Sequence, residues 1–391
     1  EIYTYTLGEA EKFNMKHIKG DSLNKMGTYY LDIGDYKNAL NYLTRSLEIW
    51  EENGDVEQMA TVLNNIGGVY QQRGDYTTAY EYQNRTLELR KKIGDKRRIS
   101  NGYHNLGLLC KMRGNHGEAL EYYNHSLKLS EKISDKIGMG YTLGNIGAIY
   151  EIKGEHDLAL NFMNRSLLIK EELGDKRGVE SRLHGIGYIL LNKGKYDIAL
   201  EHFTRSQSIK EELGYKRGMG RGFESIGQVY YYKGDLDKAL DYYKRGLAVR
   251  EDLGNKRGIG HSFYHIGCIF FENGNHIKAK DYFEKSIEIQ NQIDLKEGNL
   301  LLATTIMLFC VYKQFSRIYD INEIFILIKK SEYIDDEINY HLYQLLEDTS
   351  YLETAYNQIQ EKAANLEPDI AAKFLSYPLP KAIVEEWEKV K

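Results

Sequence analysis

Proline and cysteine are both scarce in this chain. Only three prolines occur among 391 residues, and because proline disrupts the interior of a helix, this scarcity is typical of an almost wholly helical protein. The three cysteines, Cys110, Cys268 and Cys310, lie far apart, so they form neither a disulfide framework nor the paired spacing of a zinc-binding motif. Such cysteine usage is typical of a reducing compartment, and we expect a cytoplasmic protein.

The chain also lacks a charge surplus and a long hydrophobic run. Its net charge is −5, which argues against bulk attraction to nucleic acid or to an anionic membrane surface. Its most apolar segment, residues 300–311, is too short to cross a bilayer, because a transmembrane helix needs about 20 apolar residues. We therefore expect neither nucleic acid nor a membrane as a partner, and the sequence leaves the oligomeric state open.

Motifs of catalysis and cofactor binding are missing as well. The sequence contains no GxSxG nucleophile elbow, no GxxxxGK[ST] phosphate loop and no run of metal ligands. His261 and His265 have the i, i+4 spacing of two metal ligands on one helix, but no HExxH motif or cysteine pair supplies a third and fourth ligand. We interpret them as a solvated or hydrogen-bonded pair, and we expect no enzyme activity, no metal and no cofactor.

What the sequence does contain is a forty-residue repeat, present in seven copies without a register shift. The first column of the repeat is a glycine at Gly27, Gly67, Gly107, Gly147, Gly187, Gly227 and Gly267. A second glycine column follows at Gly34, Gly74, Gly114, Gly154, Gly194, Gly234 and Gly274. An alanine column comes next, at Ala39, Ala79, Ala119, Ala159, Ala199, Ala239 and Ala279.

Each copy is predicted to form two helices joined by a turn. In residues 181–191, apolar side chains recur at helical spacing around Gly187. Since a glycine inside a helix costs about 1 kcal/mol relative to alanine, its recurrence indicates that a neighbouring helix approaches too closely for a Cβ atom. Gly194 suits the left-handed residue that ends a helix, and in most copies an aspartate is placed to cap the next first helix.

These landmarks resemble the tetratricopeptide repeat (TPR) family. Its pattern is matched by the first glycine column, by a tyrosine three residues later in several copies, and by small residues in the columns of Ala39 and Ser46. The period and the recurrent GDKRG resemble the longer repeats of Pins-type polarity adaptors. The resemblance implies an all-α superhelical solenoid of helix-turn-helix repeats that binds proteins or peptides on its concave face, without catalysis.

The repeat register divides the chain into three parts. Residues 20–299 hold the seven tandem repeats, residues 1–19 align with the second helix of an incomplete upstream repeat, and residues 300–391 hold a degenerate eighth repeat and a C-terminal helical cap. A cap is expected because a terminal repeat must be shielded from water. Residues 353–387 resemble the closing segment of TPR arrays in microbial signalling proteins, where the array follows an NTPase, kinase or nucleotide-cyclase part. That resemblance implies that this chain is the sensor or scaffold arm of a larger signalling protein.

In the N-terminal half, the positions that line the concave face of TPR proteins carry carboxamides and one histidine. These candidate peptide-binding residues are Asn64, Asn65, Asn101, His104, Asn105 and Asn145. A carboxamide both donates and accepts hydrogen bonds, so a ladder of them can bond the main chain of an extended peptide. The resemblance places Asn65, Asn105 and Asn145 where peptide-binding TPRs hold the ligand backbone, but the match fails at Gly185, Ser225 and His265. The alternative is that these asparagines bond neighbouring helices of the same solenoid.

Farther along the chain, the same face is aromatic and cationic. Its candidate peptide-binding residues are Tyr188, Arg221, Tyr231, Tyr232, His261, Tyr264 and His265. Tyrosine and arginine are enriched at interface anchors, although tyrosines can equally pack between repeats. We expect a non-catalytic scaffold or sensor that recognises a peptide or protein segment in a concave groove. The alternative is a regulatory sensor that binds a small molecule or short signalling peptide in one pocket near Tyr231 and Arg221.

Basic pairs recur in the turns between copies, at Lys96 and Arg97, Lys176 and Arg177, Lys216 and Arg217, and Lys256 and Arg257. The sequence suggests no acidic partner at a fixed spacing. We therefore expect either a basic stripe for an acidic or phosphate-bearing partner, or a simple solubility role.

Overall fold

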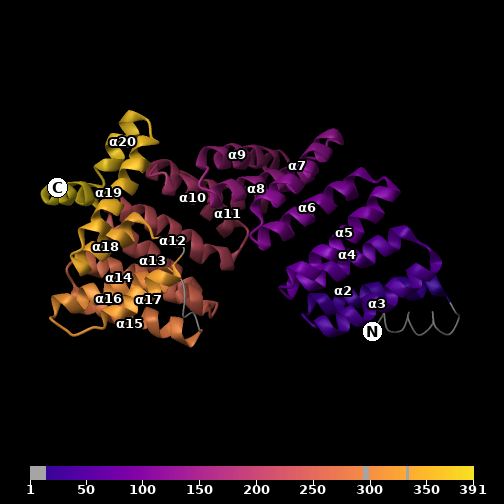
Figure 1. Ribbon diagram of the computed structural model, residues 1–391, viewed down its shortest axis with the longest axis horizontal. Helices are drawn as coiled ribbons and strands as arrows, with labels where there is room; N and C mark the ends of the chain where they lie inside the picture. The colour runs from indigo at the N-terminus through magenta and orange to yellow at the C-terminus, as the bar shows by residue number, and fades with distance from the viewer. Residues whose placement is uncertain (1–14, 294–298, 332–333) are drawn as a thin grey trace. The chain divides into compact units, whose positions relative to one another are not determined.

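The computed structural model describes residues 15–293, 299–331 and 334–391, and the chain divides into two compact units after Asp175. Within the described ranges it contains twenty α-helices and no strand (Figure 1). The predicted all-α fold is confirmed. Residues 1–14, which hold most of the predicted upstream helix, lie outside the described residues.

The first unit contains four helix pairs. Its helices are α2 (Lys16–Asp32), α3 (Tyr36–Asn53), α4 (Val56–Gln72), α5 (Tyr76–Ile93), α6 (Lys96–Met112), α7 (His116–Lys132), α8 (Lys136–Ile152) and α9 (His156–Glu172). The two helices of a pair pack against each other, and the second helix of one pair packs against the first helix of the next. Because α2 begins at Lys16, the predicted boundary between residues 19 and 20 falls inside this helix.

The second unit contains three further pairs and a C-terminal region. The pairs are formed by α10 (Lys176–Asn192), α11 (Tyr196–Glu212), α12 (Lys216–Tyr232), α13 (Leu236–Asp252), α14 (Lys256–Glu272) and α15 (His276–Gln292). The C-terminal region is formed by α16 (Asn299–Gln314), α17 (Ile321–Lys330), α18 (Asp336–Leu346), α19 (Thr349–Ala364), α20 (Pro368–Leu375) and α21 (Pro378–Val390).

The two glycine columns have the structural roles that their spacing predicted. A Cβ atom added at Gly187 would lie 2.8 Å from the ring of Phe203, and one added at Gly227 would lie 2.8 Å from the ring of Tyr243. Both rings belong to the second helix of the same pair, so the expected close approach is confirmed. At the turn glycine Gly194, φ is +72°, the left-handed conformation expected for a helix end.

Small polar residues join the two helices in several of the pairs. Ser166 Oγ donates a 2.6 Å hydrogen bond to the Gly140 carbonyl oxygen, and Ser286 makes the same contact with Gly260 at 2.8 Å. These buried hydroxyl groups connect the second helix of a pair to the first, which explains the small-residue column of Ser46. Asp135 caps α8 by accepting a 3.2 Å hydrogen bond from the backbone N–H of Gly138, as the sequence predicted.

Two of the predicted basic residues, Lys176 and Lys216, have acidic partners at a fixed spacing, contrary to our expectation, and Lys136 shares this arrangement. Lys256 instead contacts the neutral side chain of Gln292. Lys136 pairs with Glu172 at 2.7 Å, Lys216 pairs with Asp252 at 3.1 Å, and Lys176 forms the corresponding pair. Each pair spans 36 residues, from the start of one helix to the end of its hairpin partner. The spacing was missed because it joins two helices and is therefore not a pattern within either one.

The C-terminal region packs against the last pair and also reaches back to earlier turns of its unit. Helix α16 is buried at ten consecutive positions, residues 302–311. The ring of Phe374 lies 2.5 Å from the position of a Cβ atom on Gly194. The rings of Tyr377 and Tyr196 have centroids 4.8 Å apart. Helix α20 and the start of α21 therefore cover the turn between α10 and α11.

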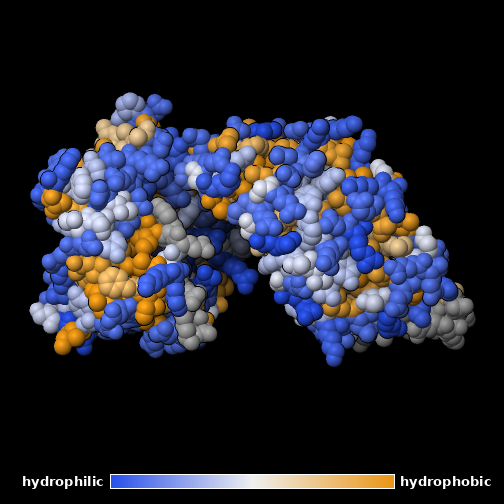
Figure 2. Space-filling view, in the orientation of Figure 1, coloured by the Kyte–Doolittle hydropathy of each residue, from blue (hydrophilic) through white to orange (hydrophobic). Residues whose placement is uncertain are grey.

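Apolar side chains gather over α16 and α17 on the face shown in Figure 2. Phe325 and Ile326 of α17 are 42% and 56% exposed. No helix in the described ranges combines the length and the apolar character that crossing a membrane requires.

Candidate functional site

A cavity of about 180 Å³ lies within the second unit, lined mainly by residues of α12, α14, α16 and α18. Five of the residues that we predicted for peptide binding line it: Tyr231, Tyr232, His261, Tyr264 and His265. The structure therefore brings side chains of two repeats to one place, and adds residues of the C-terminal region that the sequence analysis did not single out.

Helical spacing explains why these side chains meet. His261, Tyr264 and His265 lie three and four residues apart on α14, so they share one face of that helix. Tyr231 and Tyr232 are at the end of α12. The first helices of successive pairs contact each other directly, as α12 and α14 do. Side chains on this face of neighbouring repeats consequently lie within reach of one another.

The C-terminal region contributes two carboxyl groups, those of Asp335 and Glu337, to the lining of the cavity, and we call them the acidic wall. Glu337 accepts a 3.1 Å hydrogen bond from the hydroxyl group of Tyr232. Burial, together with the negative charge of nearby Asp335, raises the pKa of Glu337 to about 8. Among the described residues, no lysine, arginine or histidine lies within ion-pair distance of this carboxyl group. Within the described ranges Glu337 therefore has no cationic partner, whereas its neighbour Asp336 pairs with Lys362.

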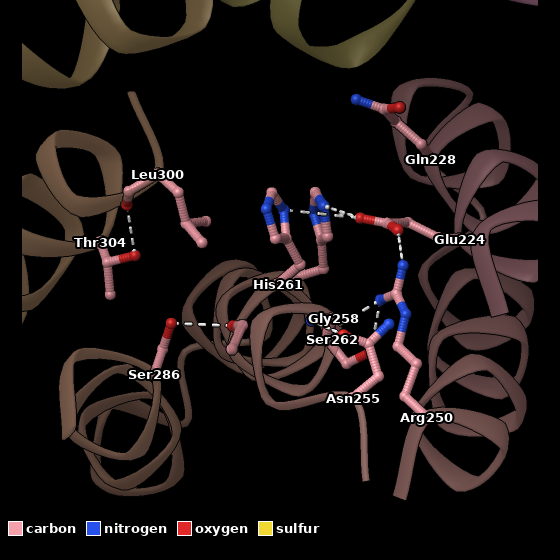
Figure 3. Close-up of polar contacts among 12 residues, drawn as sticks. Glu224, Gln228, Arg250, Asn255, Gly258, His261, Ser262, Ser286, Leu300 and Thr304 are labelled. Atoms are coloured by element: carbon pink, nitrogen blue, oxygen red, sulfur yellow. Dashed lines mark hydrogen bonds and ion pairs between the residues drawn. The ribbon is translucent and has the colours of Figure 1, made fainter. Parts of the chain in front are cut away.

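A charged cluster adjoins the cavity at His261 and His265 (Figure 3). His265 Nε2 lies 3.2 Å and His261 Nδ1 lies 3.8 Å from the same oxygen, Oε1 of Glu224 on α12. The other carboxylate oxygen of Glu224 pairs with Arg250 of α13. The Arg250 guanidinium group also donates to the carbonyl oxygen of Gly258 at 3.0 Å and to Ser262 Oγ at 2.8 Å.

The protonation states of this cluster follow from its surroundings. Burial alone would raise the pKa of Glu224, but the hydrogen bond with His265 and the charge of Arg250 outweigh burial and hold the pKa below its usual range. Burial lowers the pKa of His261 to about 4, so that this imidazole is neutral at pH 7.

The Glu224–His265 contact is one instance of a contact that recurs between neighbouring repeats, across 41 residues. In the first unit, Asn65 donates to Asn24 at 2.9 Å, and Asn145 contacts His104 at 3.3 Å, both across the same interval. The carboxamides that we predicted for peptide binding are therefore engaged at least in part by the solenoid itself.

The remaining predicted residues lie outside the cavity. Asn64 accepts a 3.2 Å hydrogen bond from Arg90, Asn101 is exposed and Asn105 is half-buried. In the second unit, Arg221 is exposed and Tyr188 is 44% exposed, and neither lines the cavity. Of the thirteen predicted residues, five share the cavity of the second unit.

Several residues of the site were missed at the level of sequence. Glu224 occupies the repeat column of Asn64 and His104, so the repeat register could have identified it. Asp335 and Glu337 belong to a region without that register, and no sequence signal connects them to α12 and α14.

Sequence comparison identifies the repeat. A tetratricopeptide repeat family model matches residues 58–132, 138–212 and 219–292, more than half of the chain, and a second model of the same repeat matches residues 20–53. The chain belongs to the tetratricopeptide repeat family. No curated protein sequence matches this TPR chain.

Solved structures with the same fold include TPR sensor proteins. A signal transduction ATPase with numerous domains (STAND) from Pyrococcus horikoshii, which has a tetratricopeptide repeat sensor, is 18% identical with a TM-score of 0.61; the match covers 84% of this chain and 48% of that one. The apo form of RapI is 18% identical with a TM-score of 0.56, over 71% of this chain and 99% of that one. A Rap protein complexed with competence and sporulation factor is 14% identical with a TM-score of 0.52, over 98% and 100% of the two chains. At these identities the similarity shows the fold alone.

Proposed function

We propose that this TPR chain is a protein-interaction scaffold or sensor whose second unit binds a peptide or protein segment, with one basic side chain of the ligand inserted into the cavity. The observation that carries the proposal is Glu337, a partly buried carboxyl group that faces the cavity and has no cationic partner among the described residues. TPR proteins are generally non-catalytic scaffolds, which agrees with this role.

The size of the cavity favours a single anchoring side chain. Its volume is about 180 Å³, whereas pockets for complete small-molecule ligands are usually about 300 to 1,000 Å³. The alternative of a small-molecule sensor is therefore less well supported than an interface in which one residue of a longer ligand occupies the cavity.

The chemistry of the lining favours a cation. Tyr231, Tyr232 and Tyr264 line the cavity, and the faces of aromatic rings attract ammonium and guanidinium groups. A lysine or arginine of the ligand would also pair with the Glu337 carboxylate, and this pairing would offset the free-energy cost of ionising that group.

The signalling context rests on similarity of fold. One of the similar structures is a STAND protein with a TPR sensor, and another is a Rap protein bound to competence and sporulation factor. These precedents support the proposal that this chain is the sensor or scaffold arm of a larger signalling protein.

A library of short synthetic peptides, randomised at each position, tests the proposal. We expect the wild-type protein to enrich lysine or arginine at one position, and the Glu337→Gln variant to lose this enrichment. Glu353→Gln removes an exposed carboxylate from the neighbouring helix α19 and is the matched control. Binding without a preference for a basic residue, or an unchanged preference in Glu337→Gln, would contradict the proposed cation site.

A further inference from the structure

We propose that Glu224, His261 and His265 form a binding site for one divalent transition-metal ion, with Zn²⁺ the best fit to the ligand set. This cluster differs from the cation site at Glu337, which lies in the C-terminal region. The two proposals therefore stand or fall separately.

The geometry of the three side chains carries the inference. One ligand atom from each side chain can be chosen so that all three lie within 4.8 Å of one another. Zn–N and Zn–O bonds of about 2.0 to 2.2 Å at tetrahedral angles place ligand atoms about 3.3 to 3.6 Å apart. The distances from Glu224 Oε1 to the two imidazoles, 3.2 and 3.8 Å, are close to this range. Small side-chain rotations would complete the site.

The surroundings of the cluster hold the carboxylate in position. Arg250 pairs with one oxygen of Glu224 and leaves Oε1 directed at the histidines, as Figure 3 shows for His261. Arg250 is in turn fixed by Gly258 and Ser262. Partners that orient a ligand in this way are typical of metal sites. The positive charge of Arg250 also opposes a second cation, so we expect an affinity below that of a site without it.

The cluster is not a general property of the repeat. The equivalent inter-repeat contacts in the first unit are Asn24–Asn65 and His104–Asn145, each with at most one histidine. In the part of the chain that the structure describes, Glu224, His261 and His265 are the one group of three potential metal-binding side chains.

The position of the histidines leaves one side of the ion open. His261 and His265 both line the cavity, so a fourth coordination position would face it and would be filled by water or by a group of a bound ligand. Because the proposed cation site at Glu337 lines the same cavity, bound Zn²⁺ would weaken the binding of a basic side chain there through charge repulsion.

Titration of the EDTA-treated full chain with Zn²⁺, followed by calorimetry, tests the site. We expect one equivalent of Zn²⁺ to bind, and Co²⁺ to produce the visible absorption of a tetrahedral N/O site. His261→Ala removes a direct ligand and should weaken binding of both ions by at least about 10- to 100-fold, the loss that mutation of an outer-shell partner already causes. His104→Asn is the matched control, because it replaces the histidine of an equivalent inter-repeat contact with the residue found at Asn24 and Asn64, and its affinity should equal that of wild type.

Absence of stoichiometric Zn²⁺ binding, or equal affinity in His261→Ala and His104→Asn, would overturn the proposal. Glu224→Gln should also weaken binding, but it leaves Arg250 buried without its carboxylate partner. Its circular dichroism spectrum must therefore match that of wild type before its affinity is interpreted, and His261→Ala remains decisive if Glu224→Gln does not fold. None of these measurements requires a peptide ligand.

Discussion

The two units use the arginine at one position of the second helix of a pair in two chemically different ways. In the first unit, Arg90 donates to the neutral carboxamide of Asn64 at 3.2 Å and to the carbonyl oxygen of Arg98 at 3.3 Å. In the second unit, Arg250 occupies the equivalent position, but it pairs with the carboxylate of Glu224 and donates to the carbonyl oxygen of Gly258. The same frame therefore holds an arginine with neutral acceptors in one unit and an arginine–carboxylate pair in the other.

The comparison shows how a repeat protein can acquire a site without changing its fold. The repeat columns fix the backbone. In a carboxamide contact such as Asn24–Asn65, the two side chains hydrogen-bond to each other. Replacement of such polar residues by Glu224 and His265 at the same positions concentrates charge next to a cavity. Four predictions test how far the two units differ.

The largest difference in stability between the units should appear when Arg250 or Arg90 is replaced. We expect Arg250→Met to lower the free energy of unfolding by about 3 to 5 kcal/mol, because it leaves the Glu224 charge in the interior without its guanidinium partner. Arg90→Met should cost only about 1 kcal/mol, because its partner Asn64 is neutral. Urea denaturation followed by circular dichroism measures both. Equal losses in the two variants would show that the charge of Glu224 does not matter for stability.

The acidic wall should make stability dependent on pH. In the folded chain, burial and nearby Asp335 raise the pKa of Glu337 from 4.5 to about 8. Folded chains therefore retain a proton that unfolded chains lose above pH 4.5, so the free energy of unfolding falls as the pH rises from 4.5 to 8 and levels off above it. Glu337→Gln removes this loss and should stabilise the protein at pH 9 by about 3 to 5 kcal/mol, with no gain at pH 4.

Thermal unfolding at the two pH values measures this effect. Glu118 of the first unit also belongs to a tyrosine–carboxylate hydrogen bond, accepted from Tyr80 at 2.8 Å. The guanidinium group of Arg113 lies near this pair, 5.3 Å from the Tyr80 ring centroid. Glu118→Gln should consequently not stabilise the protein at pH 9. If it stabilised the protein as much as Glu337→Gln does, the pH dependence could not be assigned to the surroundings of Glu337.

Adding a methyl group at the column glycine should change stability by different amounts in the two units. We expect Gly227→Ala to destabilise the chain by about 1 to 2 kcal/mol, since its Cβ would lie 2.8 Å from the rigid ring of Tyr243. Gly67→Ala places its Cβ 3.0 Å from the flexible amide of Gln83, and the better helix propensity of alanine should offset the crowding. Chemical denaturation of both variants tests this order, and a larger loss for Gly67→Ala would refute it.

The exposed ion pairs of the two units should contribute equally little to the free energy of unfolding. Lys136–Glu172 and Lys216–Asp252 join equivalent positions on the surface, where an ion pair is worth less than about 1 kcal/mol. Lys136→Gln and Lys216→Gln should each change the free energy of unfolding by about 0.5 kcal/mol or less. A loss above about 1 kcal/mol in one variant alone would indicate that its pair is coupled to a larger network.

Much of the fold and part of the site could be predicted from the sequence. The columns of Gly227 and Gly234 and the spacing of apolar residues specify a helical hairpin, because both depend on contacts within one copy. The same register put Tyr231, Tyr232 and Tyr264 on one face, and they line the cavity. The peptide-binding role of these residues stays a prediction. The 36-residue ion pairs escaped notice because they connect two helices.

The sequence by itself determined the repeat, its helical hairpins and the inward direction of one face of α12 and α14, since each follows from periodic local spacing. Only the tertiary structure decided which distant groups meet. It placed Glu337, 105 residues after Tyr232, within hydrogen-bond distance of its hydroxyl group, and it brought Glu224 to the two histidines of the next repeat. Contacts between helices depend on how the chain packs, and the C-terminal region, which lacks the repeat register, carries no periodic signal from which that packing could be derived.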